Sequence, residues 1–404
     1  MSKALLKTAA HPAQDAAPDP LDVATDLAKR LAETANARDQ AGGHAAQERE
    51  WIRESGLLTL SIPTAFGGQG ADWPTVYQVI RIVARADSAL AHVLGFHYLQ
   101  LAGVDLYGTP QQQRRFLTQT VEQNLFWGNA LNPLDRRTTA VEADYGFVLD
   151  GVKSFSSGSV GSDWLTISAW HAETETALIG VLPTRQEGVS VQADWDAFGQ
   201  RQTDSGNVHF NQVALPSTQV LQAPGHTPTA RATLRSQIAQ LIMANLYLGI
   251  GEGAFEAARA YTLSEARPWF ASGAACAAAD PLIQHRFGQL WLKLRPAAVL
   301  ADHAAQELDR LFRLGSAVTA RQRGELAVAV AEAEAKVLAH TAGIDVSNQM
   351  FELTGARSTS ARYGYDRFWR NVRVHTLHDP VDYKIRDLGR YALDGTVPEP
   401  TAYS

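Results

Sequence analysis

The stretch 367–380 holds the densest set of residues that could do chemistry. Arg367, Arg370 and Arg373 recur every three residues. Residues three apart are neighbours on a helix, so these side chains would form one cationic face that suits an anionic ligand. They could instead be solvated or paired with carboxylates, because the chain has 42 acidic and 36 basic residues.

A corner rich in histidine follows the arginines. Asp379-Pro380 predicts a helix N-cap and a first-turn proline, which leaves His375 and His378 in the corner between two helices. Two imidazoles there could meet a substrate, while Asp379 is interpreted as structural. The spacing is not the i, i+4 histidine pair of a helix-borne zinc site and no cysteine joins it, so we expect no metal.

His92 and His97 lie in a further helix, expected over 89–106 after the cap Asp87-Ser88. Five residues separate them, which is about 140° around a helix axis, so they cannot easily face one pocket. A histidine among Leu, Val and Phe is often a satisfied core group. From the residues alone, His92 is equally compatible with a site and with a core.

Helices are predicted on both sides of a region rich in strands. In the first part, helical spacing or caps predict helices at 21–35 (ending at Gly42-Gly43), 45–55, 74–86 and 89–106, with an extended piece at 57–63. From about residue 125, alternation and turns predict strands at 126–130, 141–149 (a hairpin), 164–170, 177–182, 189–195 and 206–213. Long amphipathic helices are expected at 236–263, 282–314 (kinked by Pro296), 321–353 and 381–393.

These patterns predict an α+β protein with three structured parts. We expect a flexible tail at 1–18, an N-terminal helical domain at 19–124, a small antiparallel β-barrel or sandwich at 125–222 and a C-terminal four-helix bundle at 223–404. Residues 249–254 match the dinucleotide pattern G-x-G-x-x-A, but they lie inside a helical pattern and follow no strand. Glycines within a helix more often permit close helix packing.

Composition narrows the class of protein. Hydrophobic residues at 45% and charged residues at 19% describe an ordinary soluble globule, and a net charge of −6 argues against nucleic-acid binding. Cys276 is the only cysteine, so no intrachain disulfide is possible and a cytoplasmic location is expected. Neither a signal peptide nor a long uninterrupted apolar run is recognised, so no membrane association is expected.

The order of helices, small β-domain and helical bundle resembles the acyl-CoA dehydrogenase superfamily, over roughly residues 20–395. Local sequences at 62–70, 199–206 and 267–270 are similar to landmarks of that family. Within the superfamily, the chain most closely resembles the flavin-dependent monooxygenase branch, and in particular the dibenzothiophene monooxygenases. The segments that carry this resemblance are 42–43, 68–75, 201–206, 239–242, 266–269 and 363–380.

The resemblance implies an activity and a cofactor. Reduced FMN would be supplied by a separate NADH-dependent flavin reductase and would react with O₂ to a C4a-hydroperoxide. Oxygen would then pass to the sulfur of a small aromatic substrate, taking dibenzothiophene to its sulfoxide and sulfone. A cytoplasmic homotetramer is the assembly that the family implies.

The resemblance also implies residue roles. Asn129 and Ser157 match positions at the flavin ring edge, and Trp195 matches one that packs near the isoalloxazine and the substrate. His92 and His378 match a pair that would steady or protonate the peroxide.

Arg267 and Arg370 match basic positions near the flavin phosphate. His375 is also expected to bind the cofactor. One departure concerns the substrate side, where Phe96 stands in place of a tyrosine close to the flavin. A smaller thiophene, a sulfone or an indole-like ring is therefore also compatible with the sequence.

Besides oxygen transfer to sulfur, three alternatives remain open at this point. Acyl-CoA dehydrogenases need a carboxylate base over the flavin, whereas this corner offers histidines, which suit a peroxide in a dry pocket better. The alternatives are a dehydrogenase with a displaced base, a flavin monooxygenase for an indole-like or amine substrate, and a scaffold that lost its chemistry.

Overall fold

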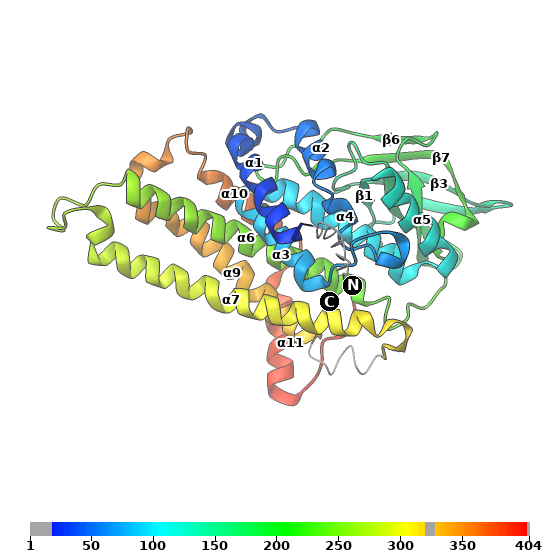
Figure 1. The fold of residues 1–404 in the computed structure, drawn as a ribbon. Helices are drawn as coiled ribbons and strands as arrows, with labels where there is room; N and C mark the ends of the chain where they lie inside the picture. Colours follow the sequence, from blue (N-terminus) through cyan, green and yellow to red (C-terminus); the bar gives the residue numbers. More distant parts are fainter. Residues whose placement is uncertain (1–17, 320–327, 402–404) are drawn as a thin grey trace, which may run out of the picture.

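The computed structural model describes residues 18–319 and 328–401. Helices at both ends of the sequence flank a β-sheet that lies to one side of the molecule (Figure 1). This is the predicted three-part α+β architecture, so the fold class is confirmed. Nearly all of the predicted tail and the first residues of the helix expected at 321–353 lie outside the described residues.

Five α-helices form the described N-terminal part, from residue 18 on. They are α1 (Pro20–Ala41), α2 (Ala46–Glu54), α3 (Trp73–Ala86), α4 (Ser88–Tyr107) and α5 (Pro110–Gln123). α4 begins where the Asp87 side chain accepts from the N–H groups of Ala89 and Leu90. α5, which was not predicted, starts with a capping box between Thr109 and Gln112.

The segment predicted as extended at 57–63 instead begins with a short 3₁₀ turn, η1 (Leu57–Thr59), and a second one, η2 (Thr64–Phe66), follows it. The chain folds back on itself here, since the Gly70 N–H donates to the Ile62 carbonyl at 2.8 Å. A Cβ at Gly68 would lie 2.2 Å from the Ile62 oxygen, so only glycine permits this close approach.

The described strands form a mixed sheet. They are β1 (Trp127–Ala130), β2 (Thr139–Ala143), β3 (Gly146–Lys153), β4 (Trp164–His171), β5 (Thr176–Pro183), β6 (Val189–Val191), β7 (Val208–Pro216) and β8 (Val220–Gln222). Their order is β6-β7-β3-β2-β4-β5-β8, with β1 parallel to β4. Most other pairs are antiparallel as predicted, but β2 also meets β4 in a single parallel pair. β6 ends before the predicted residue 195, and β8 was not predicted.

The C-terminal part comprises α6 (Leu234–Ser264), α7 (Pro281–Arg313), α9 (Val328–Thr354), α10 (Asp366–His375) and α11 (Val381–Asp394). α6 is the core helix and packs on α3, α4, α7 and α9. It is long and apolar enough to cross a membrane, but 83% of its apolar window is buried inside the protein. α7 continues through Pro296.

Glycines set the distance between α6 and α3. A Cβ at Gly249 would lie 2.5 Å from the Ala84 Cβ, and one at Gly253 would lie 2.3 Å from the Arg85 oxygen. The dinucleotide-like pattern in α6 therefore serves helix packing, as the sequence indicated.

Candidate functional site

Two histidines from different parts of the chain meet in the interior. The ring centroids of His92, on α4, and His375, at the end of α10, are 4.7 Å apart. His92 also stacks on Phe96, one turn further along α4, at 4.0 Å. Neither ring nitrogen of His92 has a hydrogen-bond partner among the described residues. An imidazole with two unmet nitrogens in a buried place is suited to a bound molecule.

Both imidazoles are held in the neutral form. Burial, with a smaller contribution from the nearby His378, lowers the pKa of His92 to about 3. Burial and the two neighbouring histidines hold the pKa of His375 well below its usual value. The pair therefore offers uncharged donors and acceptors at any physiological pH.

The corner after α10 is fixed by α6 and by a loop of the β-domain. The Tyr247 hydroxyl donates to the His375 carbonyl at 3.0 Å. The His375 Nδ1 lies 3.4 Å from the Gln200 Nε2, and Gln200 also donates to the Ser88 hydroxyl at 3.0 Å. Gln200 thus links the β-domain to the start of α4 and to the histidine corner.

Asp379 corrects one prediction. The N-cap of α11 is Pro380, without a side-chain cap, so Asp379 does not cap that helix. Its Oδ1 is instead 2.5 Å from the Lys336 Nζ and 2.9 Å from the His378 Nδ1, so one carboxylate oxygen meets both side chains. Although burial alone raises the pKa of Asp379, the bonds from His378 and Lys336 lower it below its ordinary range. Asp379 therefore orients His378, whose side chain is 39% exposed.

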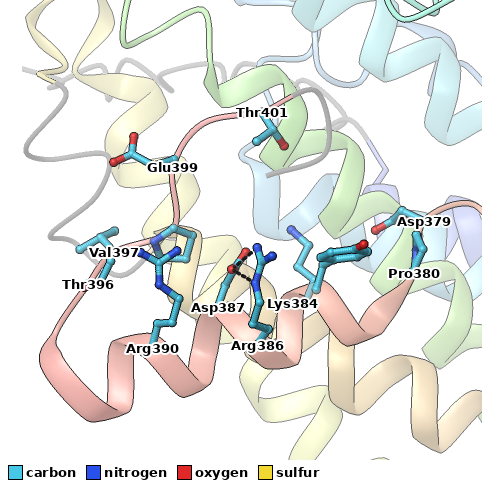
Figure 2. A pocket seen from close by; sticks show the side chains of 12 residues that line it. Asp379, Pro380, Lys384, Arg386, Asp387, Arg390, Thr396, Val397, Glu399 and Thr401 are labelled. Atoms are coloured by element: carbon cyan, nitrogen blue, oxygen red, sulfur yellow. Dashed lines mark hydrogen bonds and ion pairs between the residues drawn. The ribbon is translucent and has the colours of Figure 1, made fainter.

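A second buried ion pair lies beside the first. The Lys384 Nζ on α11 is 2.8 Å from a carboxylate oxygen of Glu332 on α9, and both side chains are buried. A pocket of about 370 Å³ opens between α11 and residues 396–401, and Asp379 and Lys384 line it (Figure 2). None of the three histidines lines this pocket, so it is not the site assembled around His92.

Asn129 and Ser157 come together on the β-domain. The Asn129 N–H, on β1, donates to the Ser157 carbonyl at 2.9 Å. The Ser157 hydroxyl is 2.8 Å from the Ser205 hydroxyl, in the loop 199–206. Trp195 lies just before this loop and is bonded to it, because its indole N–H donates to the Gln200 carbonyl at 2.8 Å.

Phe155 completes this side of the site, although sequence reasoning did not single it out. Its ring stands edge-on to Trp195 at 6.0 Å and the side chain is 68% exposed. Its φ of 56° is left-handed, which is strained for an aromatic residue. An exposed aromatic in a strained backbone is typical of a ligand contact.

The loop 199–206 is anchored on two sides. A Cβ at Gly199 would lie 2.2 Å from the Arg370 carbonyl, so the loop lies directly on α10. At its other end the Asp204 carboxylate is 2.7 Å from the His44 Nδ1 and 3.2 Å from the Arg49 guanidinium. Gln200 was not predicted as a site residue, although the stretch that contains it was recognised as a family landmark.

The predicted cationic face of α10 is used within the chain. Arg370 is 2.5 Å from Asp39 and 2.8 Å from Asp366. Arg367 turns inward and donates to the Ala86 carbonyl at 3.3 Å. Arg370 therefore pairs with carboxylates, whereas Arg367 meets a backbone carbonyl, and the role of Arg370 near the flavin phosphate stays a prediction.

Arg267 does not join the other predicted site residues within one chain. It is exposed, in the segment that follows α6. That segment is at the end of the long helices opposite the sheet, far from β1, which carries Asn129 (Figure 1). Among the described residues, no group of three His, Cys, Asp or Glu side chains could hold a metal ion.

Comparisons with known proteins agree with this architecture. The chain matches the family models of the acyl-CoA dehydrogenase N-terminal domain at 22–124, middle domain at 130–213 and C-terminal domain at 241–383. It is 47% identical over 385 residues to a Pseudomonas putida protein named Probable FMNH2-dependent monooxygenase SfnC, covering 95% of this chain and 97% of that one.

Two solved structures superpose closely. Methanesulfinate monooxygenase MsuC of Pseudomonas fluorescens is 45% identical with a TM-score of 0.93, covering 96% of this chain and 100% of that one. FMN-bound TdsC of Paenibacillus sp. A11-2, a dibenzothiophene monooxygenase, is 39% identical with a TM-score of 0.91, covering 95% and 100%. The resemblance predicted from the sequence is confirmed.

Proposed function

The chain belongs to the acyl-CoA dehydrogenase family, as a flavin-dependent monooxygenase that uses FMN, and from this premise we propose that it oxygenates the sulfur of a small organosulfur compound. The observation that carries the proposal is the buried, neutral His92 with both ring nitrogens unmet. Dibenzothiophene and alkylsulfinates are the substrate types named for its relatives, TdsC and MsuC.

The residues present fit a bound flavin. Asn129 and Ser157 offer polar groups beside the exposed, strained Phe155 and its neighbour Trp195, and His92 supplies unmet nitrogens on the helical side. We assign Asn129, Ser157, Trp195 and His375 to FMN binding, with Phe96 on the substrate side. Reduced FMN, when bound, supplies two electrons and activates O₂.

The histidines of this chain would act on the oxygen that is transferred. His92 is uncharged, so it can donate one hydrogen bond and accept another without attracting a counter-ion into the site. His378, oriented through its Nδ1 by Asp379, would present its Nε2 for proton transfer. Asp379 itself is committed to Lys336 and His378, which disfavours its use as the base of a dehydrogenase.

The burial of the residues around His92 supports the same chemistry. His92, Phe96 and His375 are all buried, and water around an activated oxygen would divert it to hydrogen peroxide. Phe96 adds an apolar ring next to His92 without a hydroxyl group.

Assembly and partners follow from the family and from the exposed groups. FMNH₂ dependence implies a separate flavin reductase. Exposed apolar residues Leu282, Trp291, Leu292 and Val299 lie along α7, and we infer that they bury against further copies in a cytoplasmic homotetramer. In that assembly Arg267 would serve the flavin phosphate of a neighbouring copy.

Product analysis tests the proposal. The purified protein is mixed with FMN, NADH, a flavin reductase and air, and offered dibenzothiophene, methyl phenyl sulfide or methanesulfinate, with catalase present to remove free peroxide. We expect an S-oxygenated product from at least one compound, dependent on both the reductase and this protein. Consumption of NADH without product from any of them would refute it.

A further inference from the structure

Arg235, in the first turn of α6, is a largely buried arginine with no carboxylate partner among the described residues. Its Nη2 donates to the Gln100 Oε1 at 3.2 Å, and its Nε is buried without a partner among the described residues. A guanidinium has five N–H donors and stays charged, so the neutral oxygen of Gln100 does not balance its charge. Most other interior arginines pair with acids: Arg38 with Glu48 and Asp87, Arg49 with Asp204, Arg81 with Asp302, and Arg231 with Asp105, while Arg367, which forms no ion pair in the described part of the chain, has the carboxylates of Asp39 and Asp87 nearby.

The surroundings of Arg235 make its charge costly. Burial lowers the pKa of this guanidinium, and the only opposing influence is that of the phenol group of Tyr107. The first turn of a helix also disfavours a cation, because the macrodipole is positive there. A positive charge kept under both penalties is explained if a ligand brings the missing negative charge.

The side chain of Arg235, on α6, contacts the face of α4 that carries His92. Positions on this face follow one another at spacings of four, four, three and four residues: His92, Phe96, Gln100, Gly103 and Tyr107. At 100° per residue they fall within about 80° of one another, so they form one stripe along α4.

Contacts run along this stripe without a break. His92 stacks on Phe96, and the Gln100 side-chain amide donates to the Phe96 carbonyl at 3.0 Å. Gln100 in turn accepts from Arg235, whose Nε would be 3.5 Å from a Cβ at Gly103. The guanidinium thus lies beside the span from Gln100 to Gly103, roughly 12 to 17 Å along the helix axis from His92 by the rise per residue.

We propose that Arg235, supported by Gln100 and Tyr107, binds an oxyanion of the substrate at the end of the site away from His92. The substrate is then a small organosulfur compound that also carries a carboxylate or a sulfonate. This inference rests on the proposed function and narrows its substrate class. The reaction stays balanced: one atom of O₂ joins sulfur, the other leaves as water, and FMNH₂ supplies two electrons and two protons.

A matched pair of sulfides tests the assignment. Methyl phenyl sulfide and 4-(methylthio)benzoate present the same reacting sulfur and differ in one carboxylate. Sulfoxide formation is measured with the wild type, Arg235→Met, Arg235→Lys and Arg114→Met, which removes an exposed arginine on α5. We expect Arg235→Met to lower kcat/KM about 10- to 100-fold for the benzoate, as for a charged hydrogen bond, and less than threefold for the neutral sulfide. Arg235→Lys should keep part of the preference, and Arg114→Met all of it.

Binding without turnover separates this inference from the proposed function. Calorimetric titration of 4-(methylthio)benzoate into the oxidised FMN-loaded protein needs no oxygen transfer. Binding weakened at least tenfold by Arg235→Met, and unchanged by Arg114→Met, supports the anion site even if no sulfoxide is ever formed. Equal affinity of wild type and Arg235→Met, or an equal loss of kcat/KM for both sulfides, overturns it.

Discussion

Replacing Asp379 with asparagine should cost far more stability than breaking an ion pair at the surface. Lys336 is 1% exposed, and the change leaves its charge buried beside a neutral amide. Removal of one partner from a buried pair costs about 3–5 kcal/mol. Because asparagine still offers an oxygen to Lys336, we expect about 3 kcal/mol. Asp26→Asn, which breaks the exposed pair with Lys29, should cost less than about 1 kcal/mol.

A double-mutant cycle isolates the pair. Lys336→Met alone should also destabilise, whereas Lys336→Met with Asp379→Asn removes both charges and should lose at least about 2 kcal/mol less than the sum of the single changes. Urea unfolding of the FMN-free protein at one fixed concentration, followed by tryptophan fluorescence, measures the free energy of unfolding.

Two results would refute the reasoning: an Asp379→Asn protein within 1 kcal/mol of the wild type, or additive effects in the cycle. The double variant also separates folding from positioning. It should fold well and still lose oxygenation, because His378 loses its carboxylate partner.

Three further predictions concern the core of the site. His92→Gln should lower sulfoxide formation about 100-fold or more while NADH is still consumed, because the flavin is reduced and oxygen is released as peroxide; unchanged product yield would count against a role for His92. The depressed pKa of His92, about 3 against an unfolded value near 6.5, means that the unfolded chain binds an extra proton between these values; His92→Gln should therefore reduce the rise of stability with pH by up to about 1.4 kcal/mol per unit at pH 4–6, measured by urea unfolding. Gly199→Ala would place a Cβ 2.2 Å from the Arg370 carbonyl, so the loop must shift and FMN affinity should fall at least tenfold in a fluorescence titration, whereas Gly288→Ala, in open space and like Gly199 without a positive φ, serves as the control.

Much of the fold could be predicted because its helices and strands carry local signals. The caps at Asp87 and Asp72 and the stop at Gly42 set helix ends that local rules can read. The segment 57–63 could not be read this way, since its turns depend on backbone bonds from Gly70 and Ala71. The parallel pairing of β1 with β4 is likewise a long-range property that alternation does not encode.

The site was predicted only in part, because the roles of some residues depend on neighbours that are distant in the sequence. His92 and His375 were recognised separately, but they are 283 residues apart in the sequence. No rule based on local spacing predicts a contact between them. Asp379 has the sequence signature of a helix cap, yet its carboxylate forms an ion pair with a lysine from α9. Arg235 was not singled out, because an arginine in a helix is ordinary until its missing partner is seen.

The most direct test of the account is a single turnover under ¹⁸O₂ with FMNH₂-loaded protein and a sulfide substrate, followed by mass spectrometry of the product. The account predicts one ¹⁸O atom in each sulfoxide molecule, formed in wild type and strongly reduced in His92→Gln. A product without label, or equal labelled yield from the two proteins, would contradict it.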